Sequence, residues 1–111
     1  MDINHVKEGE ITIVTVNGRL DGTTARVADK TNKKLLKRDC LRMIFDFSTL
    51  DYLSNGGLEV IMEATKELRR KEGQIVLCSL SNLVKEIFEV SGINSLIPIT
   101  ESLESGIEQM G

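Results

Sequence analysis

Histidine is almost absent from this chain of 111 residues, and cysteine and proline are rare. The one histidine, His5, lies in the first β-branched segment, so a Ser-His or Cys-His nucleophile pair would depend on that residue alone. Hydrolase chemistry is therefore disfavoured. The two cysteines, Cys40 and Cys78, lack the CxxC spacing that is typical of zinc or redox sites. We expect both thiols to be reduced, Cys78 to be the more buried, and no metal to be bound.

Other absences concern long apolar runs, positive charge and short catalytic motifs. No apolar run approaches the roughly 20 residues that cross a bilayer, and neither end has a signal pattern, so we expect a cytoplasmic protein without a membrane partner. The net charge of −3 leaves no basic field for a phosphate backbone, which disfavours nucleic acid as a partner. The Walker A, dinucleotide-binding, HExxH and GxSxG patterns are missing. The sequence therefore predicts no cofactor.

The most informative stretch runs from Leu41 to Gly73. Residues 41–46 are a short apolar run of strand length, and residues 48–57 read as a tight polar loop. A helix is predicted after the loop, because apolar residues recur there at helical spacing: Leu58, Ile61, Met62, Thr65 and Leu68. Ser54 or Asn55 is expected to cap this helix, whose first turn offers free backbone N–H groups. Gly73 is expected to end it.

The N-terminal third predicts a hairpin followed by a helix. Residues 3–6 and 11–16 are β-branched runs separated by a short polar turn, which indicates two antiparallel strands. Turn residues fill 17–24, and a helix should then place Val27, Ala28, Thr31 and Leu35 on its inner face. The lysines of this helix should form a solvated basic face.

The C-terminal third predicts a further strand, two helices and a short edge strand. Residues 74–78 form an apolar strand, parallel to the preceding strand because a helix connects the two. Ser79 or Ser81 should cap the next helix, whose inner face is Leu80, Leu83, Val84, Ile87 and Phe88, and Ser91-Gly92 should stop it. Residues 96–99 contain the only proline and suit a sheet edge. Thr100 should cap a last helix.

The predicted fold is thus α/β: a single domain over residues 1–111, with a mixed, mostly parallel β-sheet covered by about four helices in the order ββαβαβαβα. The residues predicted to form its core are Ile13, Val14, Ile44, Phe45, Leu58, Ile61, Leu68, Val76, Leu77, Leu83 and Ile87.

Open sheets of this kind bind ligands at the carboxyl ends of their strands. An enzyme would have to draw on Asp21, Asp46, Asp51 or Ser54 there, and none of them lies in a catalytic motif. Asp46 is better explained as a turn acceptor. We therefore predict that the protein is not an enzyme, while a small enzyme or nucleotide-binding protein at the same loop remains an alternative.

Two stretches carry a family resemblance. Gly18-Arg19-Leu20-Asp21, and more specifically residues 46–58 with the sequence DFSTLDYLSNGGL, resemble the signature stretches of the STAS domain, the family of bacterial anti-sigma factor antagonists. The resemblance extends over the whole chain in the order and length of its elements.

The resemblance implies which residues form the site. In the family, the second stretch holds the Ser or Thr that a partner kinase phosphorylates, and Asn55 occupies that position here. Asparagine has no hydroxyl, so Asn55 cannot accept a phosphoryl group, and Ser54 is a possible substitute. The resemblance places partner binding at six residues: Asp21, Ser54, Asn55, Gly56, Gly57 and Leu58.

The resemblance also implies partners. It predicts a noncatalytic module that captures an anti-sigma factor of the serine protein kinase type and so releases a sigma factor, with a phosphatase as a second possible partner. A phosphate brings about −1.5 to −2 charges, which would repel an acidic partner surface, so the unmodified protein should be the binder. The alternative implied by the family is a scaffold or sensory subunit of a larger STAS signalling assembly.

Overall fold

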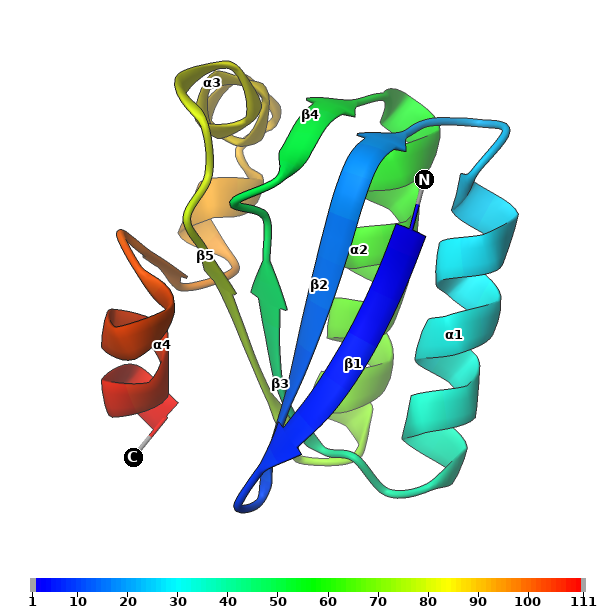
Figure 1. The fold of residues 1–111 in the computed structure, drawn as a ribbon, viewed down its shortest axis with the longest axis vertical. Coiled ribbons are helices and arrows are strands. Elements are labelled where there is room, and N and C mark those ends of the chain that lie inside the picture. The colour runs from blue at the N-terminus through cyan, green and yellow to red at the C-terminus, as the bar shows by residue number, and fades with distance from the viewer. Residues whose placement is uncertain (1, 111) are drawn as a thin grey trace.

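The computed structural model describes residues 2–110, and four helices and a six-stranded sheet make up most of this part of the chain (Figure 1). The strands are β1 (Asp2–Glu8), β2 (Ile11–Leu20), β3 (Arg42–Asp46), β4 (Leu50–Leu53), β5 (Gln74–Cys78) and β6 (Ile99–Thr100). The helices are α1 (Ala25–Lys37), α2 (Asn55–Arg70), α3 (Asn82–Ser91) and α4 (Leu103–Met110), with a 3₁₀ turn at Ile93–Ser95.

The sheet has the order β1-β2-β3-β5-β6, and only the β1–β2 hairpin is antiparallel. This confirms the predicted mixed, mostly parallel sheet with four helices. It also confirms the parallel pairing of the strands at 42–46 and 74–78. None of the helices between residues 2 and 110 is long and apolar enough to span a membrane.

The predicted polar loop between residues 48 and 57 contains an additional strand, β4, which pairs in parallel with the end of β2. β2 therefore continues past residue 16, where the sequence predicted its end. It pairs with β3 through Thr12–Thr15 and with β4 through Gly18–Leu20, and the register of the β4 pairing shifts by one residue between Gly18 and Arg19. Gly18 has φ of 86°, a conformation that glycine adopts without the steric cost of a side chain.

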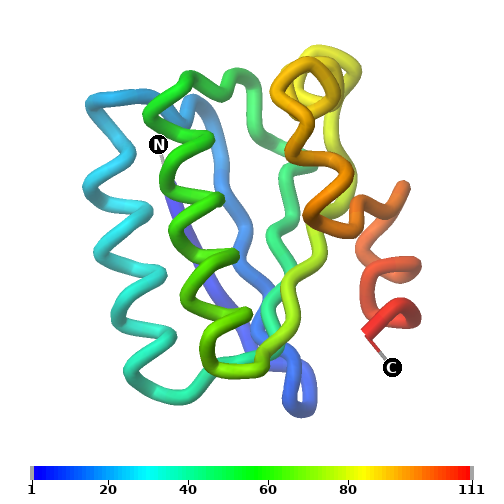
Figure 2. Tube along the Cα trace, turned by 180° about the vertical axis from the view of Figure 1, so that it is seen from behind, coloured from blue at the N-terminus to red at the C-terminus, as the bar shows by residue number. Residues whose placement is uncertain are grey.

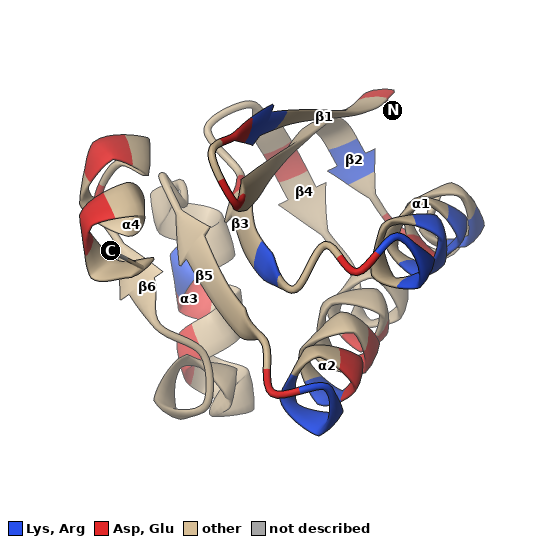
Figure 3. Cartoon of the chain, turned by 90° about the horizontal axis from the view of Figure 1, so that it is seen from below, with Lys and Arg blue, Asp and Glu red and all other residues tan. Residues whose placement is uncertain are grey.

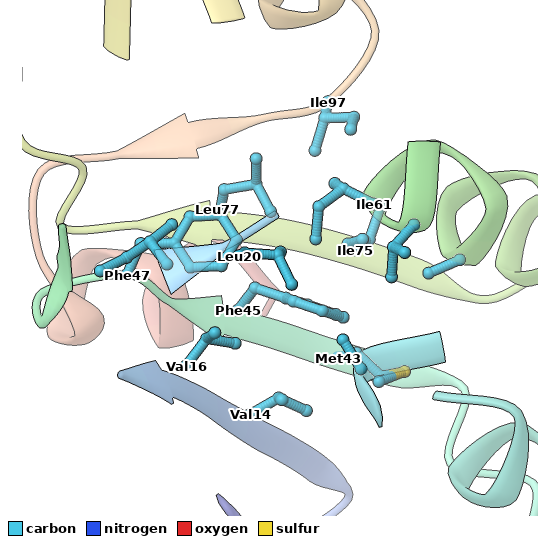
Figure 4. Close-up of a cluster of buried hydrophobic side chains, with 14 of the residues drawn as sticks. Val14, Val16, Leu20, Met43, Phe45, Phe47, Ile61, Ile75, Leu77 and Ile97 are labelled. Atoms are coloured by element: carbon cyan, nitrogen blue, oxygen red, sulfur yellow. The ribbon is translucent and has the colours of Figure 1, made fainter. Parts of the chain in front are cut away.

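Alternating residues of the strands point into two separate apolar clusters, one on each face of the sheet. The larger cluster joins the sheet to α1, α2 and α3, and includes Phe45, Phe47, Ile61 and Leu77 (Figure 4). The smaller cluster includes Ile13, Ile44, Val76 and Cys78 and lies under α4, which covers the other face.

Eight of the eleven predicted core residues are buried, and three are not. Leu58 and Ile87 are half-buried, and Leu83 is 53% exposed. Helix α3 has apolar residues on two adjacent stripes, and it is Val84 and Phe88 that it turns into the core. Val27 of α1 is likewise exposed, while Ala28 and Leu35 are buried as predicted.

Of three predicted helix ends, two need correction and one, the start of α3, is confirmed. Helix α2 ends at Arg70 rather than at Gly73, and Glu72 adopts the left-handed conformation that reverses the chain. Ser81, one of two candidates, caps α3 by accepting the N–H of Val84 at 3.3 Å. At the start of α4, the hydroxyl that accepts a first-turn N–H belongs to Ser102, not to Thr100.

Candidate functional site

The first part of the site is the loop between β2 and α1, which Asp21 organises. Its Oδ1 accepts hydrogen bonds from the Thr23 hydroxyl at 2.6 Å, the Thr23 N–H at 2.9 Å and the Thr24 N–H at 3.2 Å. These bonds, those from Thr23 above all, lower the pKa of Asp21 from its ordinary value to about 2. The carboxylate is therefore ionised at neutral pH. It shapes the loop and cannot act as a general acid there.

The second part is the turn from β4 into α2, which Ser54 fixes at both ends. Its backbone N–H donates to the carbonyl of Leu20 at 3.0 Å, which ties the turn to β2. Its side-chain oxygen accepts the N–H of Gly57 at 3.3 Å, so Ser54 is the N-cap of α2. Asn55 is the first helical residue and is exposed. Of the two predicted cap candidates, only Ser54 caps the helix. Asn55 lies inside the first turn, so the preference of asparagine for cap positions does not apply to it.

The two loops meet through glycines. A Cβ atom on Gly56 would lie 3.4 Å from the Cα of Gly22, so the two backbones almost touch. A Cβ atom on Gly57 would lie 2.5 Å from the Leu20 carbonyl oxygen, which leaves no space for a side chain. The two glycines therefore allow the backbones of the two loops to lie close together.

Arg19 and Tyr52 form a contact between the two strands that lead into the loops, and the sequence did not predict it. The two residues are register partners on β2 and β4, and the Arg19 guanidinium lies 4.3 Å from the centre of the Tyr52 ring. Arg19 also approaches Asp21, with Nε 3.6 Å from Oδ2. Only the unpredicted strand β4 brings Tyr52 here, so the sequence alone carried no signal for this pair.

An apolar hollow adjoins Asn55 on the side of α3. It is lined by Leu58 of α2 and by Leu83, Ile87 and Val90 of α3. Val90 is 83% exposed and Leu83 is 53% exposed, which is unusual for large apolar side chains. The stripe that the sequence placed in the core thus forms part of the surface next to the predicted site.

The structure brings five of the six predicted site residues to this end of the sheet as one surface: Asp21, Ser54, Asn55, Gly56 and Leu58. The sixth, Gly57, is buried beneath it.

The other acidic candidates do not converge on a reaction centre. Asp46 accepts the N–H of Ser48 at 3.0 Å, the turn role expected for it, and Asp51 is exposed. Cys78 is fully buried, and burial together with the nearby Asp46 charge raises its thiol pKa to about 11. Both cysteines are free, and Cys78 is the more buried, as predicted. Across residues 2–110, no three metal-ligating side chains gather in one place.

Comparison with known proteins identifies the family from the sequence. The family model described as "STAS domain" matches residues 2–106. A protein of Bordetella bronchiseptica described as an anti-sigma factor antagonist, BtrV, is 32% identical over 104 residues, covering 86% of this chain and 90% of that protein.

Two solved structures have a closely similar fold. An anti-sigma factor antagonist of Thermotoga maritima superposes with a TM-score of 0.92 at 16% identity, over 96% of this chain and 92% of that one. The phosphorylated form of the Bacillus cell fate determinant SpoIIAA gives a TM-score of 0.78 at 16% identity, over 99% of this chain and 100% of that one. This chain therefore belongs to the STAS domain family.

Proposed function

We propose that this protein is an anti-sigma factor antagonist: a noncatalytic module that captures an anti-sigma factor of the serine kinase type and so releases a sigma factor. The observation that carries the proposal is the joined loop surface, in which Ser54 and Gly56 hold two loops together around an exposed Asn55. The relative from Bordetella bronchiseptica supports the assignment.

The surface suits binding because its parts are ordered before a partner arrives. Asp21 and Ser54 are held by their own hydrogen bonds, so little conformational entropy remains to be lost there on association. Gly22 and Gly56 place backbone rather than side chains at its centre, which allows a partner to approach closely. The apolar hollow of Leu58, Leu83, Ile87 and Val90 adds the desolvated patch that interfaces commonly contain.

We propose further that the module is permanently in its binding-competent form. Asn55 has no oxygen nucleophile and lies at the first position of α2, where an added phosphate would lie in the middle of the surface. A kinase that acts on this position in other members of the family would leave this protein unmodified. Ser54 is the nearest hydroxyl, but its oxygen already caps α2, so a phosphate there would replace the Gly57 bond.

Binding is tested by calorimetric titration of the protein with a purified anti-sigma factor of the serine kinase type. We expect Gly56→Arg to weaken binding by at least tenfold, about 1.4 kcal/mol, because its side chain and charge would stand between the two loops. Gln109→Arg adds the same charge on exposed α4 and is the matched control. If the two folded variants bind the anti-sigma factor with equal affinity, the interface does not include the two loops.

The proposal that the protein is permanently binding-competent is tested by mass spectrometry after incubation with the kinase and ATP. We expect no phosphate on the wild type and one phosphate on Asn55→Ser. Asn55→Asp should weaken partner binding only partly, because one carboxylate has less charge than a phosphate. Phosphate on Ser54 of the wild type would show that the acceptor has moved by one residue. No phosphate on either protein would remove the switch from this proposal.

A further inference from the structure

Helices α1 and α2 lie side by side on one face of the sheet (Figure 2). A long groove runs between them on the surface. The groove begins at Gly22 and Gly56 and extends to Lys71, beyond the end of α2. Its upper half is a wide, shallow depression of about 530 Å³, and its lower half is narrower, at about 390 Å³.

The two walls of the groove carry net charges of opposite sign. The α1 wall has three basic residues, Arg26, Lys33 and Lys37, and one acidic residue, Asp29. The α2 wall has three acidic residues one helical turn apart, Glu59, Glu63 and Glu67, and two basic residues at its lower end, Arg70 and Lys71, of which Arg70 pairs with Glu67. The segregation is visible where the blue segments of α1 lie near the red bands of α2 (Figure 3).

The two walls are joined at the lower end of the groove, where Lys71 donates to the Leu36 carbonyl of α1 at 3.2 Å. Among the described residues, no ion pair within 4.0 Å crosses the groove; Lys33 pairs with Asp29 of its own helix, at 2.9 Å. The pKa of Lys33 is raised chiefly by Asp29, with smaller contributions from Glu63 and Glu67 across the gap. The walls therefore interact electrostatically while leaving room between them.

The groove has an unsatisfied amide at its base. Asn32 of α1 is 2% exposed, and neither its Oδ1 nor its Nδ2 has a hydrogen-bond partner within residues 2–110. A buried polar group without a partner costs free energy and is rare in native structures. Asn32 is one of the residues that line the lower half of the groove, together with Lys33, Lys37 and Arg70.

We propose that this groove binds an extended peptide segment of a protein, in which basic and acidic residues alternate. In an extended residue the backbone N–H and C=O point to the same side, so one residue can pair with both Oδ1 and Nδ2 of Asn32. Alternate side chains of the segment would then reach the two walls, basic ones toward α2 and acidic ones toward α1.

The spacing of the walls agrees with this geometry. Residues four apart on α2, such as Glu59 and Glu63, are separated by about 6 Å along the helix axis. Side chains on the same side of an extended segment repeat every 6.6 Å or so. The two repeats stay in step over the three glutamates, which corresponds to a segment of about five residues. This binding goes beyond the proposed function and does not depend on it.

The test is a titration of the ¹⁵N-labelled full chain with the acetylated and amidated hexapeptide Lys-Glu-Lys-Glu-Lys-Glu, followed by NMR. The side-chain amide signals of Asn32 report directly on the proposed hydrogen bonds. We expect them to shift saturably at peptide concentrations up to about 5 mM, since isolated short segments bind weakly. The hexapeptide Lys-Lys-Lys-Glu-Glu-Glu, with the same composition, should bind at least fivefold more weakly.

Two variants separate binding from packing. Asn32→Leu removes the unsatisfied amide at similar volume, so it should raise the midpoint of thermal unfolding and weaken peptide binding about fivefold. Glu63→Gln removes one wall charge at an exposed position and should weaken binding about threefold, whereas Glu104→Gln on α4 should not. The proposal is overturned if the Asn32 amide signals do not move, if the two hexapeptides bind equally, or if Asn32→Leu binds like the wild type.

Discussion

Gly57 is the position at which one added methyl group should disturb the site most. In the structure, the new Cβ of Gly57→Ala would lie 2.5 Å from the Leu20 carbonyl oxygen and 2.7 Å from Leu53 Cδ1. Neither neighbour can move freely, because the Leu20 oxygen accepts the Ser54 N–H and Leu53 is only 2% exposed. The substitution must therefore either strain the start of α2 or displace it from β2.

The expected cost follows from three contributions. Overpacking of this kind costs about 1–3 kcal/mol, and losing the Ser54 hydrogen bond would add about 1 kcal/mol. Replacing a helical glycine by alanine returns at most about 1 kcal/mol. We expect Gly57→Ala to lower the free energy of unfolding by about 1–3 kcal/mol.

Gly56→Ala is the matched control, since its Cβ would meet nothing closer than 3.4 Å. It should leave stability unchanged or raise it by up to about 1 kcal/mol. Both variants are measured by urea denaturation followed by far-ultraviolet circular dichroism, because the chain has no tryptophan. The reasoning is refuted if Gly57→Ala unfolds at the same urea concentration as Gly56→Ala.

Three further predictions concern the core, the Asp21 carboxylate and the buried thiol. Ile61→Ala removes a fully buried side chain and should cost about 2–5 kcal/mol in urea denaturation, whereas Leu83→Ala should cost much less; equal losses would contradict the helix faces described. Because the folded pKa of Asp21, about 2, is below its unfolded value, its contribution to stability is present above pH 4 or so and is lost as pH falls toward 2. Asp21→Asn should flatten that part of the acid unfolding curve, and a side-chain NMR titration midpoint near 4 would contradict this account. Iodoacetamide at pH 8 should alkylate Cys78 only as fast as the protein unfolds, since the thiol is buried and its pKa is about 11; a rate like that of a free thiol would count against the structure.

The sequence predicted the elements whose patterns are local. The apolar runs of β3 and β5, the 3.6-residue repeat of α2 and the glycine stop after α3 all follow from neighbouring residues. Strand β4 was not predicted from the sequence, because Leu50–Leu53 is only four residues long and contains the charged residue Asp51. What makes it a strand is its pairing with the end of β2, and a distant pairing of this kind leaves little local signal.

The candidate site was predictable to the level of its residues but not of their roles. The polar turn identified Ser54 and Asn55 together, and only the geometry distinguishes the cap from the exposed first helical residue. The sequence could not predict which face of α3 is buried, because the neighbouring residues Leu83 and Val84 are both apolar. Packing in the folded protein buries Val84 and leaves Leu83 exposed. The burial of Asn32 without a partner has no sequence signal at all.

The change of partners along β2 has a consequence for how the loop surface comes into being. The lower half of β2 pairs with β3, while its end, from Gly18 to Leu20, pairs with β4. Any binder that needs both loops therefore recognises a chain in which two separate ladders have already closed, and not a nascent or half-opened one. By mass action such a binder holds both ladders shut. Backbone amides of β4 should then exchange with deuterium more slowly in the complex.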